Sequence, residues 1–244
     1  MDRFYQQLED YEEAVVASGI NETFSKQVDI VRPKMRASET LGDGLPEPES
    51  IRAMANYMVE QWGEDPPEAG IEIASFGAGK CFVESVLDAH PDITLECFDV
   101  REAENIFIGD DKFKLLDSPE ASERLARKKA RFDYILLLIW PDDTNSMAAD
   151  LLGRESKNRW KHVVYVGEPM HQGAPGCTAT LEFFELLEAH YGVPEKILPC
   201  FNWKYKNQYY DGTSLFTKDN VYMYTLKEKG LNATFRPRTF RFKV

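Results

Sequence analysis

The chain has 244 residues and a formal net charge of −12, from 29 basic and 41 acidic residues. This length suits one large α/β domain or two small ones, and the composition is that of an ordinary globular protein. The acidic balance argues against a nucleic-acid footprint over the whole surface. The longest apolar run, residues 134–140, has the length of a strand, so the sequence predicts no membrane span.

The four cysteines, Cys81, Cys97, Cys177 and Cys200, are widely spaced, without a C-x-x-C motif or a histidine at zinc spacing. We therefore expect reduced thiols in a cytoplasmic protein and no metal site. The first residues are acidic and amphipathic, so we also expect no signal peptide.

The chain opens with apolar residues at helical spacing, which predict a helix over 2–18. These residues are Phe4, Leu8, Tyr11 and Val15. Residues 19–50 contain three prolines and predict an irregular segment that covers a core or a site. Ser50 is the expected N-cap of a second helix that ends near Gly63.

Strands and helices then alternate. The predicted strands are 71–75, 93–100, 112–117, 132–140 and 162–168, and the predicted helices begin after the glycines near 79 and cover 118–130, 145–156 and 178–192. Two further strands, 195–203 and 220–226, have no helix between them and favour an antiparallel pair. This order predicts an α/β fold with a mostly parallel sheet, helices on both faces and a ligand at the carboxyl ends of the strands.

The first two strands end in residues suited to a nucleotide-like ligand. Gly77, Ala78 and Gly79 form a turn that brings the backbone close to a ligand, and the next helix offers free N–H groups. Asp99 lies 20 residues past Gly79, the spacing at which a carboxylate holds two ribose hydroxyls. The alternatives are a plain tight turn and a solvated strand end.

The next three strands end in further candidates. Asp117 can accept from an adenine amino group, or it is simply a helix cap. Trp140 can stack on a substrate or on a sulfonium cation, and Asp142 and Glu168 can act as general bases or orient a nucleophile. The alternative for these carboxylates is an exposed turn.

Together these segments resemble the class I S-adenosylmethionine-dependent methyltransferases over residues 50–227. "IEIASFGAGKC" resembles the first motif, V-E-I-G-A-G-x-G, and "ECFDV" resembles the second, with Asp99 in the ribose-binding place. The resemblance implies a Rossmann-like, seven-stranded sheet with a C-terminal antiparallel hairpin. It implies S-adenosylmethionine as the cofactor. Its cofactor-binding residues would be Gly77, Ala78, Gly79, Asp99, Asp117 and Trp140, and Trp140, Asp142 and Glu168 would be the catalytic residues on the substrate side.

A closer similarity is to uncharacterised methyltransferase-like proteins of microbes. They share the segments that read "LLLIWPDD", "SMAADLL", "VYVGE" and "GCTATLEFFELL" in this chain. The first motif departs from the family in two places. Cys81 replaces its final glycine and is expected to narrow the site near the amino-acid part of the cofactor, and the acidic residue is displaced, with Glu72 five residues before Gly77.

These observations predict three parts: an N-terminal helix and cover segment (1–49), a methyltransferase-like domain (50–230) and a basic tail (231–244). The expected function is methyl transfer to an unidentified small molecule or protein, with residues 19–50 and 203–220 closing over the site. One alternative is a binding or scaffold protein that has lost turnover, as Cys81 suggests. Another is an NAD-dependent oxidoreductase, which the missing third glycine and the hairpin disfavour.

The basic tail carries Arg236, Arg238 and Arg241 with interleaved phenylalanines, and is the one expected place for nucleic-acid contact. A sheet edge and a solvated face explain the same pattern more simply.

Overall fold

The structure is a computed structural model that describes residues 2–17, 45–61, 71–100, 106–116, 135–141, 144, 146–152, 160–168, 178–200 and 220–227. Several predictions fall outside these ranges. They concern Asp117, Asp142 and Cys177, the helix over 118–130, and most or all of the segments 19–50, 203–220 and 231–244.

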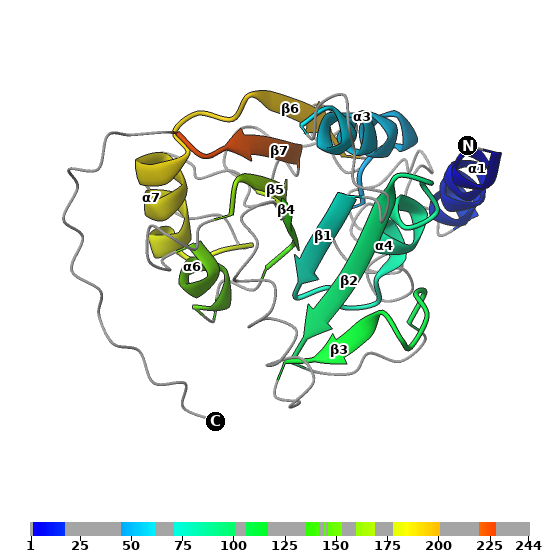
Figure 1. Cartoon of the computed structure of the whole chain (residues 1–244), viewed down its shortest axis with the longest axis horizontal. Coiled ribbons are helices and arrows are strands. Elements are labelled where there is room, and N and C mark those ends of the chain that lie inside the picture. The colour runs from blue at the N-terminus through cyan, green and yellow to red at the C-terminus, as the bar shows by residue number, and fades with distance from the viewer. Residues whose placement is uncertain are drawn as a thin grey trace, which may run out of the picture.

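Seven strands form one sheet in the order β3-β2-β1-β4-β5-β7-β6 (Figure 1). Their bounds are β1 Ile71–Phe76, β2 Ile93–Asp99, β3 Phe113–Leu115, β4 Ile135–Ile139, β5 His162–Gly167, β6 Lys196–Pro199 and β7 Asn220–Thr225. Strands β1 to β5 pair in parallel, whereas β7 is antiparallel to both β5 and β6. The predicted fold class, a mostly parallel sheet closed by an antiparallel hairpin, is confirmed.

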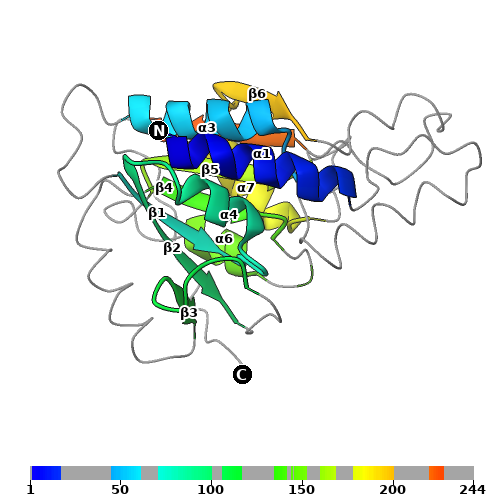
Figure 2. The same cartoon turned by 90° about the vertical axis from the view of Figure 1, so that its right-hand side faces the viewer.

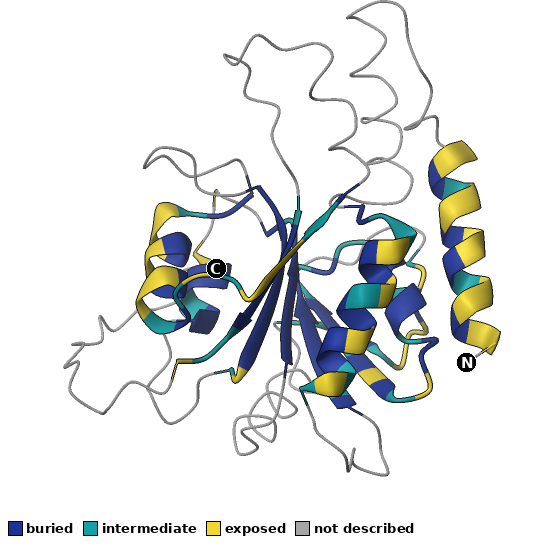
Figure 3. Cartoon of the chain, turned by 90° about the horizontal axis from the view of Figure 1, so that it is seen from above, coloured by how far each residue is buried: buried dark blue, intermediate teal, exposed yellow. Residues whose placement is uncertain are grey.

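Helices cover both faces of the sheet. Helices α1 (Asp2–Ala17), α3 (Pro48–Glu60) and α4 (Phe82–Leu87) lie on one face, and α6 (Met147–Leu152) and α7 (Leu181–His190) lie on the other. Figure 2 looks onto the first group, and Figure 3 shows the buried strands between the two groups. The predicted three-layer arrangement is therefore present.

The central strands β4 and β5 are buried on both faces of the sheet. All five residues of β4 and all six of β5 are buried. Successive side chains of a strand point to opposite faces. Ile135 and Leu137 accordingly belong to the apolar cluster under α1, α3 and α4, and Leu136 and Leu138 to the cluster under α6 and α7. A continuous apolar run is what such a two-sided strand requires.

The first helix packs onto the same core as the sheet. Its Tyr11 ring stacks on Phe82 of α4 at 4.9 Å, and its Phe4 ring meets His90 edge-on at 4.9 Å. The Tyr11 hydroxyl donates to the carbonyl of Pro46 at 2.8 Å. Helix α1 therefore contributes to the apolar cluster that contains β1, across the predicted boundary at residue 49.

The predicted start of the second helix is wrong. Helix α3 begins at Pro48, two residues before Ser50, with Glu47 as its extended N-cap. Proline suits this position because its ring presets the helical φ and its missing N–H has no partner in the first turn. The Ser50 hydroxyl instead donates to the Pro199 carbonyl at 2.7 Å and ties the helix to β6.

Helix α7 is confirmed, but it begins at Leu181, three residues after the predicted start, and ends at His190, two residues before the predicted end. Its N-cap Thr180 accepts from the Phe183 N–H, and its chain reverses at Gly192, which has φ +76°. Among the described residues, no helix is both long and apolar enough to cross a bilayer. Cys81, Cys97 and Cys200 are buried free thiols.

A polar cluster lies at the amino end of β5, opposite the carboxyl edge of the parallel strands. The Tyr57 hydroxyl donates to Glu195 Oε2 at 2.9 Å and lies 3.0 Å from Thr225 Oγ1. His162 Nδ1 lies 3.1 Å from the same Thr225 Oγ1. The His162 side chain is buried, and this burial, with a smaller effect of the neighbouring Lys161, lowers its pKa to about 4.

We expect this histidine to make folding sensitive to acid. An unfolded histidine protonates near pH 6.5, about 2.5 units above the folded value. The unfolded state therefore gains protons first, so stability is complete above about pH 6.5 and falls as the pH drops toward 4. His162→Gln should reduce the loss in free energy of unfolding between about pH 7 and 4.5 by roughly 1–3 kcal/mol, measured by urea denaturation.

The half-buried His190 in the last turn of α7 offers a matched control. The same substitution there, His190→Gln, shows how much of any change comes from removing a histidine in general rather than from the buried position 162. An identical pH dependence for wild type and His162→Gln would contradict the assignment.

Candidate functional site

The sheet order reverses direction between β1 and β4, so their carboxyl ends border a crevice. Phe76 of β1 pairs with Leu138 of β4, which brings Gly77 and Trp140 to the same edge of the sheet. The sequence predicted a ligand at this edge, and two of the predicted segments do meet there.

The glycine turn after β1 is built from left-handed residues. Gly77, Gly79 and Cys81 have φ values of +65°, +53° and +58°. The Gly77 N–H donates to the Phe98 carbonyl at 2.8 Å, which ties the turn to β2. A Cβ atom on Gly77 would lie 3.0 Å from Met147 Cε, whereas one on Gly79 would meet no described atom within 4 Å. The backbone at Gly79 is thus open to a close approach.

Asp99 joins the second strand to this turn. It is the last residue of β2, and its Oδ2 accepts the Gly79 N–H at 2.8 Å. The side chain is half-buried. The two residues that the sequence placed 20 positions apart therefore touch, and they put a carboxylate beside an open glycine backbone.

The Cys81 side chain lies beneath the turn. It is 1% exposed and belongs to the apolar cluster under α1, α3 and α4. Its Sγ lies 3.9 Å from the Gly79 carbonyl. The hydrogen bond with Cys97 lowers the pKa of the Cys81 thiol, but burial and the charges of Glu84 and Asp99 together outweigh it, so the net pKa is raised. The expected narrowing of the site by this thiol is therefore wrong for the described residues, because the side chain points into the core. What the replacement of glycine changes is the backbone, since a non-glycine residue takes a left-handed conformation here.

A buried pair that the sequence analysis did not single out lies beside the turn. Ser75, two residues before Gly77, donates its hydroxyl hydrogen to Glu84 Oε1 at 2.7 Å. Glu84 is 2% exposed and comes from the first turn of α4. Burial raises the pKa of Glu84 to about 7, the hydrogen bond from Ser75 opposes this shift, and the charge of Asp99 adds to it. The one signal in the sequence is the single acidic residue in the mostly apolar stretch 82–87.

Two further predicted residues follow the neighbouring strands. Trp140 is half-buried with φ +50°, and its backbone N–H donates to the Val166 carbonyl at 2.8 Å. Glu168, just after β5, is 2% exposed. Its N–H donates to Thr178 Oγ1 at 2.9 Å, and its carbonyl accepts from the Tyr165 hydroxyl at 2.7 Å. Both residues lie at the predicted edge, and their catalytic roles stay predictions.

No protein-family model and no curated protein sequence matches the chain. Among solved structures, it is similar to geranyl diphosphate C-methyltransferase from Streptomyces coelicolor A3(2), at 12% identity and a TM-score of 0.43 over 86% of this chain and 83% of that one. It is also similar to 1,6-didemethyltoxoflavin-N1-methyltransferase from Burkholderia thailandensis, at 14% identity and a TM-score of 0.45 over 82% and 87%.

The strand order, with β7 antiparallel between β5 and β6, is the arrangement of the class I methyltransferase fold. The chain therefore has this fold, as the resemblance of its motifs predicted.

The left-handed conformation of Cys81 has a consequence for stability. Cys81→Ala and Cys81→Gly both remove the buried thiol, but only glycine adopts φ +58° without a steric penalty. We expect the glycine variant to be the more stable one by about 1 kcal/mol in urea unfolding.

Cys97 provides the matched control because it is also buried, in β2, without a positive φ. There alanine should be more stable than glycine by roughly 0.5–1 kcal/mol. The same order of alanine and glycine at both positions would show that the turn carries no strain at Cys81.

Proposed function

We propose that the chain is an S-adenosylmethionine-dependent methyltransferase that acts on a small-molecule or protein acceptor. The observation that carries this proposal is the contact between Asp99 Oδ2 and the Gly79 N–H, 2.8 Å long, at the carboxyl edge where the sheet order reverses. An open glycine backbone beside a carboxylate suits a ligand with a ribose and an amino-acid chain.

The residues of this edge fit the cofactor in chemical type. Asp99 offers acceptor oxygens to ribose hydroxyls, and the backbone at Gly79 has space for a close approach among the described residues. The turn at Gly77 and Ala78 would line the amino-acid part. Asp117 follows β3 in the sequence, and by analogy with the methyltransferases it would accept a hydrogen bond from the adenine amino group.

The cofactor, when bound, supplies an electrophilic methyl group on a sulfonium. The protein must then orient the acceptor in line with that methyl group and exclude water. Trp140 offers an aromatic face to a cation at the end of β4. Asp142 and Glu168 would orient the acceptor or take its proton. A net charge of −12 favours a small-molecule or protein acceptor over a nucleic acid.

The second candidate is a binding or scaffold protein of the same fold. Cys81 in the place of a motif glycine motivates it. The geometry of the turn weighs against it, because Cys81 keeps a left-handed conformation, with φ +58°, at the position where the motif has glycine.

Calorimetric titration of the full chain with S-adenosylmethionine, S-adenosylhomocysteine and NAD tests the proposal. We expect micromolar binding of the first two. Asp99→Asn keeps an oxygen for the Gly79 N–H but removes the charge, so affinity should fall about tenfold. Asp99→Ala removes both and should lower affinity by about 10- to 100-fold.

Asp92→Asn is the matched control. Asp92 lies just before β2, at the opposite end of the same strand from Asp99, so its substitution should leave the affinity unchanged. Binding of NAD alone would favour the oxidoreductase, and no binding of any ligand would favour the scaffold protein.

A further inference from the structure

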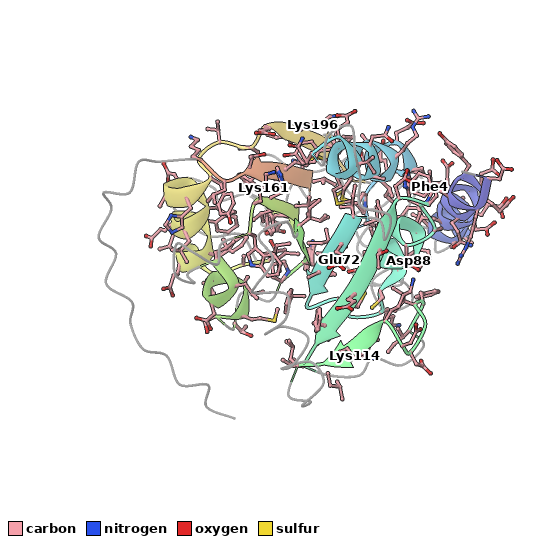
Figure 4. All side chains as sticks on the ribbon, in the orientation of Figure 1. Phe4, Glu72, Asp88, Lys114, Lys161 and Lys196 are labelled. Carbon is pink, nitrogen blue, oxygen red and sulfur yellow. The ribbon has the colours of Figure 1, made fainter. Side chains whose placement is uncertain are left out.

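The first motif of the family has an acidic residue two positions before its first glycine. In this chain that position is Ser75, which is fully buried and cannot supply a charge. Glu72, the acidic residue on the same strand, lies near the start of β1 (Figure 4) and pairs with Thr94 at the amino end of β2. It is therefore remote from the turn, and its strand does not bring a carboxylate to the glycines.

A carboxylate reaches this position from another element. Glu84 Oε1 accepts the Ser75 hydroxyl hydrogen at 2.7 Å, and the two side chains are 2% and 0% exposed. They belong to α4 and β1, the two elements that the glycine turn connects. The carboxyl group therefore lies against the base of the turn, on the side of the core.

Four titratable groups from other segments interact with Glu84. They are Tyr11 of α1, Cys81 of the turn, and Cys97 and Asp99 of β2. Burial raises the pKa values of Tyr11 and Cys97, and Cys81 also has a raised pKa, so these three groups are neutral near pH 7. Asp99 is the one carboxyl group among these four.

The same helix carries one further acidic neighbour. Asp88 follows α4 by one position, and both of its oxygens accept from Lys112 Nζ at 2.6 Å. This ion pair compensates its charge. A positive ligand at the turn would therefore interact chiefly with Asp99 and with Glu84 in its ionised form.

We propose that Glu84 supplies through space the acidic group that Ser75 lacks, and that its carboxylate favours the binding of a sulfonium cofactor over its neutral thioether product. This inference rests on the proposed function. Glu84 is here a positioning residue for charge, since Ser75 and the turn stand between it and the ligand edge.

The sign of the pH dependence follows from linkage. Without ligand, Glu84 has a pKa of about 7, so it is largely neutral at pH 6 and ionised at pH 8.5. A cation at the turn stabilises the ionised form, lowers this pKa and releases a proton. The preference for S-adenosylmethionine over S-adenosylhomocysteine should therefore grow with pH, by about three- to tenfold between pH 6 and 8.5.

The test is calorimetric titration of wild type, Glu84→Gln and Glu72→Gln with both ligands at about pH 6 and 8.5. A second series at pH 7, in buffers of different ionisation enthalpy, measures proton release. Glutamine preserves the volume of Glu84 and an oxygen for the Ser75 hydroxyl, so thermal melting should show a folded protein. Glu72→Gln is the matched control, because Glu72 is a half-buried glutamate near the other end of β1.

We expect the preference of Glu84→Gln for the sulfonium to be independent of pH, and its proton release to be smaller than that of wild type. Glu72→Gln should behave as wild type. If wild type binds both ligands and Glu84→Gln has the same pH profile and proton release, this inference is overturned while the proposed function stands. If wild type binds neither ligand at any pH, both fail.

Discussion

The hydrogen bond from the Gly79 N–H to Asp99 is the contact on which the candidate site depends. It holds the turn after β1 against the end of β2, so that a backbone with open space and a carboxylate share one edge. The turn needs left-handed backbone at Gly77, Gly79 and Cys81, a conformation in which most side chains are strained. The bond to Asp99 and the bond from Gly77 to Phe98 together hold this shape.

The turn is supported by buried elements beneath it. Strand β1 pairs with β2 on one side and β4 on the other, and its neighbours are buried by helices on both faces. Helix α1 adds a second layer over α4, through the stacking of Tyr11 on Phe82. Close packing of this kind transmits small displacements, so a change in the core below the turn reaches the edge above it.

Much of the fold follows from local patterns in the sequence. The two-sided burial of β4 is visible as a continuous apolar run, and the spacing of Asp99 from the glycines places both at one edge of a parallel sheet. The start of α3 was missed because Pro48 and Ser50 both carry helix-start signals, and the hydroxyl of Ser50 has a tertiary partner in Pro199 that no local rule shows.

The sequence did not predict the features of the site that depend on which way a side chain points in the folded protein. The sequence places Cys81 in the turn but does not tell which way its side chain points, and the structure directs it into the core. Glu84 reads as a polar interruption of an apolar helix. Only the packing of α4 on β1 shows that it faces Ser75, because the pair is created by the fold of the turn between them.

The direction of β7 determines at which edge the chain leaves the sheet. Because β7 runs antiparallel to β5, Thr225 lies beside His162, at the amino edge of the sheet and opposite the glycine turn. A six-residue strand is about 20 Å long. The described part of the chain therefore leaves the sheet about 20 Å along the strand direction from the edge that carries Asp99 and Trp140.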